Sequence, residues 1–223
     1  MRQAFIQLTA PIRRLQQKQP HELFHICIME EFTPLINYVF HYIKLTQGEE
    51  DFFVSLLRIK KVKKKQFIVQ PDFVCEYRSF VVKGLLRSFL VSDSSKEHTI
   101  TLAAENNWIS DLSSYTFQEP ATLFVEALED SILIEWSYAN EQLLIKTVPA
   151  FEHFFRVTSQ NASAMFQKRI LQGLSMSAEQ RYNEFSKKHP DLINRVPQYI
   201  LASYLGFTTE FLSKIRNKKL KKS

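Results

Sequence analysis

Residues 196–220 read VPQYILASYLGFTTEFLSKIRNKKL, and their spacing predicts two short helices joined by a tight turn. Gly206 stands where the first helix ends, at a position that favours a positive φ angle. Thr208 can cap the second helix, because its hydroxyl can accept from a free backbone N–H of the first turn. The apolar residues that we expect to face inward on the second helix are Phe211, Leu212 and Ile215. The pattern is that of a helix-turn-helix that runs into a basic tail.

The polar side chains of the second helix suggest a ligand. We expect the residues that cap this helix or face away from the first one to be Thr208, Thr209, Glu210, Ser213, Lys214, Arg216 and Lys218. Side chains of these types contact phosphates and base edges in protein–DNA complexes. The sequence therefore predicts binding to double-stranded DNA. The alternative is a helical hairpin with a solvated, charged face.

Composition is consistent with a polyanionic partner. The chain has 223 residues, a net charge of +6 and a pI near 9.2, and lysines crowd its last ten residues. Its two cysteines, Cys27 and Cys75, are too few for a disulfide framework or a four-thiolate cluster. No apolar run approaches the roughly 20 residues that span a bilayer, and residues 1–28 lack the features of a signal peptide. We expect a cytoplasmic protein without a membrane partner.

Residues 1–28 are poorly periodic and are expected to form an N-terminal extension, with an ordered extra helix as the alternative. An amphipathic helix is predicted from Met29, where apolar residues recur at helical spacing. These residues are Phe32, Leu35, Ile36, Val39, Phe40 and Ile43.

From about Asp51 to Trp136 short apolar runs alternate with polar turns, which favours an antiparallel β-roll or sandwich. We expect one strand from Ile59 to Val69 and a tight turn at Gly84. The lysine-rich run at 60–65 is interpreted as protection of a sheet edge or a solvated face, and a second nucleic-acid patch is the alternative.

From about Ser137 the pattern is helical. A short helix ends near Pro149, and a long one begins with that proline. A 3-4-3-4 seam on the long helix predicts pairing of two copies. The seam consists of Phe154, Val157, Asn161, Ala164, Lys168 and Leu171. The alternative is a helix packed on its own β domain. A further helix is expected after Ser177, with Gln180 completing a capping box.

This order of elements resembles the Crp/Fnr family of bacterial transcription regulators. The resemblance covers roughly residues 51–220 and is most specific in QPDFVCEYRSFVVKGLLRSFL, RYNEFSKKHPDLINRVPQYILASYLGF and TTEFLSKIR. It implies an α+β fold with an antiparallel, jelly-roll-like β-roll and flanking helices at 29–147, a dimerisation helix at 148–172 and an all-α helix-turn-helix domain at 173–223.

The same resemblance implies a homodimer that binds double-stranded DNA and has RNA polymerase as a further partner. The family's recognition-helix contacts would fall on Thr209, Glu210, Ser213 and Lys214. Because the family usually has Arg at the positions of Thr209 and Lys214, the preferred operator is expected to differ from the family's best-known ones.

The resemblance weakens at the sensing site. Cyclic-nucleotide-binding members carry Phe-Gly-Glu-Leu, a short loop and Arg-Ser-Ala-Thr, whereas this chain has ISDL at 109–112 and EPAT at 119–122. A carboxylate in place of the phosphate-pairing Arg is repulsive, by a few kcal/mol at ~4 Å and an effective dielectric near 20. We therefore expect neither cAMP nor cGMP, and no other cofactor. The residues of this degenerate pocket are Ser110, Asp111, Glu119, Ala121 and Thr122.

An enzymatic function is not expected. His98 is the only histidine of the β region, and none of the sequence motifs of common hydrolases or phosphate-binding loops is present. The competing hypothesis is a small-ligand-sensing β-roll that has lost DNA readout. It is favoured by the short stretch 217–223 after Arg216, which leaves no room for the family's usual β-wing.

Overall fold

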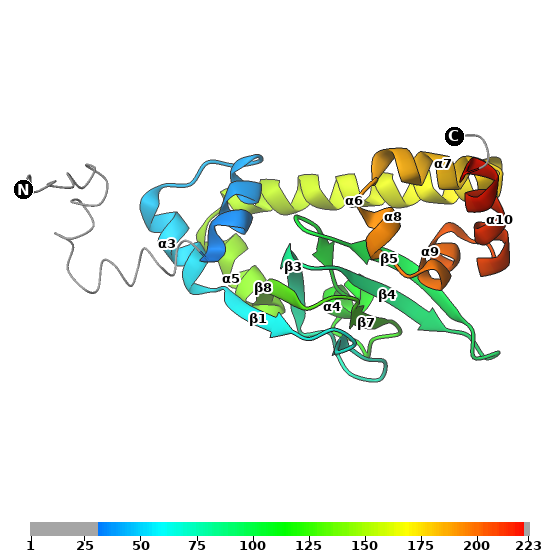
Figure 1. Cartoon of the computed structure of the whole chain (residues 1–223). Coiled ribbons are helices and arrows are strands. Elements are labelled where there is room, and N and C mark those ends of the chain that lie inside the picture. The colour runs from blue at the N-terminus through cyan, green and yellow to red at the C-terminus, as the bar shows by residue number, and fades with distance from the viewer. Residues whose placement is uncertain (1–30, 221–223) are drawn as a thin grey trace, which may run out of the picture.

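The structure is a computed structural model that describes residues 31–220; the extension expected at 1–28 lies outside them. A β-roll occupies the middle of the molecule, and α6 (Ala150–Ser175) runs along it for most of its length. The helix 31–40 lies at one end of α6, and the C-terminal helices lie at the other (Figure 1).

The amphipathic helix at the start of the described chain is confirmed over 31–40, and five of its six expected apolar residues are buried. The exception is Phe40, which is exposed. A second helix, α3 (Gln47–Ser55), replaces the strand that we expected from Asp51. Its N-terminus is a capping box, in which the backbone N–H of Thr46 donates to Glu49 Oε2 at 2.8 Å. Strands therefore begin only at Arg58.

The β-roll consists of two four-stranded antiparallel sheets, with strand orders β1-β8-β3-β6 and β2-β7-β4-β5. The strands are β1 (Arg58–Val62), β2 (Phe67–Val69), β3 (Tyr77–Lys83), β4 (Leu86–Val91), β5 (Glu97–Ala103), β6 (Trp108–Ile109), β7 (Phe124–Ala127) and β8 (Ser131–Ser137). A short helix, α4 (Leu112–Phe117), stands between β6 and β7, where the sequence suggested only a loop.

The single strand expected over 59–69 is wrong, because the lysine run contains a turn. Lys65 has a positive φ of 71°, and Asp130 holds the turn. The carboxylate of Asp130 accepts from the backbone N–H of Lys64 and from Nζ of Lys63, both at 2.9 Å. The run thus divides into β1 and β2, which are the edge strands of the two sheets.

The interior between the sheets is mostly apolar, with Ser79 and Glu135 as buried polar residues, and a second, aromatic core joins the N-terminal helices to α6. Phe154 belongs to this second core: its ring lies 5.6 Å from that of Tyr42 and 5.1 Å from that of Phe155. The placement of Phe154 in a dimer seam is therefore wrong, because its own chain already covers it.

The C-terminal helices follow the sequence pattern closely. They are α5 (Tyr138–Thr147), α7 (Ala178–Lys188), α8 (Leu192–Arg195), α9 (Gln198–Leu205) and α10 (Thr209–Leu220). The capping box of Ser177 and Gln180 is confirmed, and Gly206 ends α9 with a φ of 77°. Phe211 is not inward, since 43% of it is exposed, whereas Leu212 and Ile215 are buried.

Arg195 fastens these helices to the β-roll. Its guanidinium donates to Glu129 Oε2 at 2.7 Å, to Glu105 Oε2 at 2.9 Å and to the carbonyl of Gly84 at 3.1 Å. Glu105 in turn accepts the backbone N–H of Gly84 at 2.9 Å. Leu85 and Leu128 of the β-roll extend the apolar core of the C-terminal helices beneath this ion pair.

Two further polar contacts join α9 to β5. The hydroxyl of Ser203 accepts from the backbone N–H of Thr99 at 2.9 Å and donates to the carbonyl of Glu97 at 3.1 Å. Arg169, on α6, donates to the carbonyls of Ile100 and Tyr204, and so links three elements. The position of α9 is therefore set by the β-roll and by α6.

Gly84 provides a test of the turn on which Arg195 is fastened. Its φ of 105° disfavours other residues, and an added Cβ would lie 2.2 Å from Ser131 Oγ and 2.9 Å from Ser131 Cα. We expect Gly84→Ala to lower the free energy of unfolding by about 2–4 kcal/mol in chemical denaturation. Gly48→Ala is the control, because no atom lies within 4 Å of its added Cβ and α3 favours Ala by about 0.5–1 kcal/mol. Equal effects of the two substitutions would contradict this turn geometry.

The ion pairs of Arg195 predict a pH dependence. Hydrogen bonds from Arg195 are the largest influence that lowers the pKa of Glu105 from 4.5 to about 2. A carboxyl with a lowered folded-state pKa contributes stability above its unfolded pKa and loses it as the pH falls toward the folded value. Thermal midpoints should therefore fall between about pH 5 and pH 3, and fall less in Arg195→Gln. Arg156→Gln is the control, since the hydrogen-bond partners of Arg156 are Gln160 and His153, neither of which is a carboxylate. A pH dependence unchanged by Arg195→Gln would contradict the assignment.

Candidate nucleic-acid interface

The polar face of α10 is built on two anchoring residues. Leu212 and Ile215 are buried against α9 and α7, and this fixes which side of α10 is turned outward. Glu210 and Lys214 are exposed, one helical turn apart, while Thr209 and Ser213 are half-buried beside them. These four residues form a polar face on the outward side of α10, and we call them the α10 face.

The first turn of α10 is organised by Thr208. The hydroxyl of Thr208 accepts from the backbone N–H of Phe211 at 3.3 Å, as expected for the cap. The pKa of Glu210 is lowered, first by its own backbone N–H and then by the hydroxyl of Thr208. Glu210 is therefore an ionised acceptor near neutral pH, and it stands at the start of a helix.

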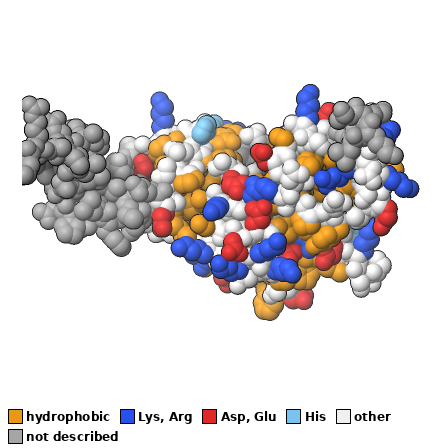
Figure 2. Space-filling view, in the orientation of Figure 1, with side chains coloured by type: hydrophobic (Ala, Val, Ile, Leu, Met, Phe, Trp, Pro, Cys, Tyr) orange, Lys and Arg blue, Asp and Glu red, His pale blue; other side chains and the backbone are white. Residues whose placement is uncertain are grey.

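The outer part of α10 is basic. Figure 2 shows Lys and Arg side chains at the end of the molecule that carries α10. Arg216 is half-buried, and Lys218 lies 3.3 Å from Glu179 of α7 in an exposed ion pair. Exposed pairs of this kind contribute roughly 0–1 kcal/mol, so Lys218 can exchange Glu179 for a phosphate at small cost.

The expected nucleotide cassette is filled by its own carboxylate. Asp111 is buried and caps α4: its Oδ1 accepts from the backbone N–H of Ser114 at 3.1 Å. Its Oδ2 accepts from the backbone N–H groups of Thr122 at 2.9 Å and Leu123 at 3.0 Å. The backbone donors that could face a ligand's anionic group are thus already occupied.

The other residues of this pocket differ in exposure. Ala121 is buried, Ser110 is half-buried, and Glu119 and Thr122 are exposed. Arg87, on β4, is a cation that could in principle replace the missing phosphate-pairing Arg, but it lies 2.7 Å from Glu97 and 2.8 Å from Glu126. Its charge is fully used by these two carboxylates.

The helix that we expected to form the dimer presents apolar side chains both on and beside the seam that the sequence suggested. Val157 is half-buried, and the seam residues that remain exposed are Asn161, Ala164, Lys168 and Leu171. Leu171, on that seam, is 57% exposed. The other large exposed apolar side chains of α6 are Met165, Phe166, Ile170 and Leu174, which are 61%, 46%, 64% and 81% exposed.

Two classes of site find no support within residues 31–220. No cluster of His, Cys, Asp and Glu side chains in that range could hold a metal ion. No helix in the same range is both long and apolar enough to cross a bilayer.

Sequence reasoning missed the residues that position the α10 face. Arg195 and Ser203 make contacts that span 66 to 111 residues of sequence, and no local pattern encodes their partners. It also missed Glu135, a buried carboxylate within an apolar strand run, which was visible as a charge in SILIEWS.

No protein-family model and no curated protein sequence matches this chain. Among solved structures, the c-di-GMP-responsive global regulator CLP of Xanthomonas campestris is similar, with 12% identity, a TM-score of 0.64, and coverage of 79% of this chain and 93% of that one. FixK2 from Bradyrhizobium japonicum has 15% identity, a TM-score of 0.63, and coverage of 74% and 85%.

A transcriptional regulator of the Crp/Fnr family from Eubacterium rectale is 17% identical, with a TM-score of 0.58 and coverage of 79% of this chain and 85% of that one. Each of these alignments covers about three quarters or more of both chains. The chain therefore has the α+β fold of the Crp/Fnr transcription regulators.

Proposed function

We propose that this chain is a homodimeric, cytoplasmic bacterial transcription regulator of the Crp/Fnr type, which reads double-stranded DNA with α10. The observation that carries this proposal is the α10 face. The four residues of the α10 face lie on the side of the helix that is opposite the buried Leu212 and Ile215. A helix presented in this way fits the width of the major groove.

The chemistry of the α10 face suits base edges. Lys214 can donate to guanine O6 or N7, and Glu210 can accept from the amino group of cytosine. Thr209 and Ser213 can serve either role. Lys is a compact cation without the two-pronged geometry of Arg, so Lys214 favours guanine without a bidentate contact. Lys218 and Arg216 lie further along the helix and are assigned to phosphates, which position the protein but carry no sequence information.

Dimerisation is proposed along α6. Phe166 and Ile170, with Ser159, Ser163 and Gly173, are exposed at a 4-3-4-3 spacing, which puts them on one face of the helix. Side chains as exposed as Ile170, in a stripe with Phe166, are typical of an interaction surface. A parallel pairing along this stripe would place two copies of α10 to engage half-sites about one helical turn apart.

The cassette is proposed not to bind cAMP or cGMP. Asp111 occupies the backbone donors of the loop, Arg87 is held by two carboxylates, and Glu119 adds a negative charge. To bind here, a cyclic nucleotide would have to displace Asp111 from the backbone donors, release Arg87 from its ion pairs and lie beside the negative charge of Glu119. A small-ligand-binding module without DNA readout is the second candidate, favoured by a cavity in the β-roll that is described below.

Lys214 separates these two functions. We expect Lys214→Ala to weaken binding to a selected operator by about 1–3 kcal/mol, while binding to a scrambled duplex changes much less. The measurement is a paired titration on both duplexes at one fixed salt concentration. Lys187→Ala on α7 is the control: it removes the same charge from an exposed site away from the α10 face, and its effects on the two duplexes should be equal. Equal losses for Lys214→Ala on both duplexes would favour the binding module.

The dimer face is tested by two matched substitutions on α6. Ile170→Asp puts a charge in the proposed stripe and should yield monomers in light scattering. Ala164→Asp puts the same charge in the seam suggested by the sequence, and it should leave the dimer intact. A monomeric wild type would contradict the proposal of a dimer. A monomeric Ala164→Asp variant with a dimeric Ile170→Asp variant would instead support the seam suggested by the sequence.

A further inference from the structure

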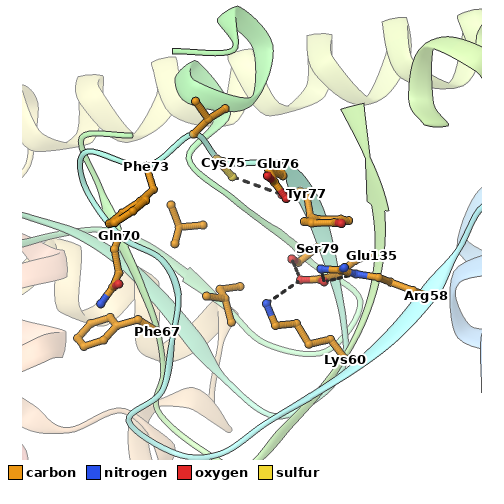
Figure 3. Close-up of a pocket in the computed structure, with 13 residues that line it drawn as sticks. Arg58, Lys60, Phe67, Gln70, Phe73, Cys75, Glu76, Tyr77, Ser79 and Glu135 are labelled. Atoms are coloured by element: carbon orange, nitrogen blue, oxygen red, sulfur yellow. Dashed lines mark hydrogen bonds and ion pairs between the residues drawn. The ribbon is translucent and has the colours of Figure 1, made fainter. Parts of the chain in front are cut away.

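A cavity of about 330 Å³ opens in the β-roll, and its lining residues lie outside the nucleotide cassette at 109–122. It lies between the inward faces of β1, β3 and β8 on one side and β2 with the segment 70–76 on the other (Figure 3). This volume is at the lower end of the range of small-molecule sites, roughly 300–1,000 Å³.

One wall of the cavity carries a buried carboxylate whose charge is balanced. Glu135 is 1% exposed, and its Oε2 accepts from Arg58 Nε at 3.0 Å and from a terminal nitrogen of Arg58 at 2.8 Å. Its Oε1 accepts from Ser79 Oγ at 2.7 Å. The guanidinium of Arg58 also lies over the ring of Tyr77, 3.3 Å from its centroid. Arg58 is therefore fixed in place and neutralises Glu135.

Lys60 then leaves the wall with a surplus positive charge. Its Nζ lies 3.8 Å from Glu135 Oε1, which is too long for a hydrogen bond. Figure 3 shows Lys60 directed into the cavity beside Glu135. Glu76 also borders the cavity, just before β3 begins at Tyr77, and its side chain is exposed. The side chain of Lys60 is 36% exposed, so its ammonium group is available to the anionic group of a ligand.

The opposite wall is apolar. Phe67 and Phe73 lie across the cavity from Lys60 (Figure 3), and Phe73 is 69% exposed although it borders a cavity. Val74 beside it is also exposed. A ligand with an apolar body would cover these side chains, and each buried methylene group would contribute about 0.8 kcal/mol.

We propose that this cavity binds a small organic carboxylate, with its anionic group on Lys60 and its apolar or aromatic body against Phe67 and Phe73. The assignment of this cavity as an effector site rests on the proposed regulator function, whereas ligand binding in the cavity does not depend on that function. The segment that carries Phe73 is bonded to the degenerate cassette: the N–H of Ala121 donates to the carbonyl of Phe73, and the N–H of Cys75 donates to Ser114 Oγ. A ligand that orders this segment acts on the loop where the resembling family places its nucleotide.

The probe is 4-(trifluoromethyl)phenylacetate, observed by ¹⁹F NMR with the full chain, and its uncharged amide is the reference ligand. We expect saturable binding of the acid, with the amide weaker by about tenfold because it lacks the charge. Lys60→Met keeps the length and apolar stem of the side chain and should weaken the acid by about tenfold, without changing the amide. Lys61→Met is the control, because Lys61 is the exposed neighbour on the opposite face of β1.

Equal affinity of the acid and the amide, equal affinity of wild type and Lys60→Met, or no saturable binding of the acid would each overturn the proposal. Thermal midpoints of both variants identify any loss of folding, and the Phe73→Ala variant gives a second readout from the apolar wall, where the acid and the amide should weaken together. The NMR titration contains no DNA, so a negative result would contradict this proposal without testing the proposed regulator function.

Discussion

The contact between Arg195 and the β-roll is the interaction on which the rest of the arrangement depends. One planar guanidinium bonds Glu105, Glu129 and the carbonyl of Gly84, so both the position and the orientation of α8 are specified. Because α9 begins three residues after Arg195, at Gln198, the same contact positions α9 and, through its buried packing on α9, α10. The position of the α10 face relative to the β-roll is therefore set by ion pairs that lie outside the α10 face.

This contact is also linked to the candidate cavity through the β-roll. Glu129 lies two residues before β8, and β8 carries Glu135 into the cavity. Ser131, at the start of the same strand, touches Gly84, whose carbonyl Arg195 holds. Strand β8 thus runs from the candidate ligand cavity to the Arg195 contact that holds the C-terminal helices. A shift in position at one end of β8 can therefore be transmitted along this strand to the other end.

Local patterns predicted the C-terminal helices well, because their signals are local. The capping box at Ser177 and the positive φ at Gly206 depend on residues a few positions away. The expected strand at Asp51 was wrong, since a short apolar run does not distinguish a helix from a strand without its cap. The cap of α3 is Thr46, just before that run. The β-roll was predicted from spacing, whereas its sheet order depends on long-range pairing that no short window contains.

The candidate sites were predicted in outline only. The α10 face followed from helical spacing, but Phe211 and Phe154 were placed on the wrong side of their helices. Each lies on an apolar stripe whose direction is decided by tertiary packing. At the cassette, the sequence showed that a phosphate partner was missing but not that Asp111 fills the backbone donors, because those hydrogen bonds close an eleven- to twelve-residue loop. The cavity beside Glu135 required three strands to be brought together, which the sequence alone does not do.

The central claim is that the α10 face reads base sequence on duplex DNA, and selection from a pool of random duplexes by the purified full-length chain tests it most directly. The account predicts enrichment of an inverted repeat, with half-site centres about one helical turn apart, as two symmetry-related recognition helices require. It also predicts that the enriched half-site differs from those read by family members with Arg at both outer contact positions. Recovery of a pool with no shared sequence would contradict the claim.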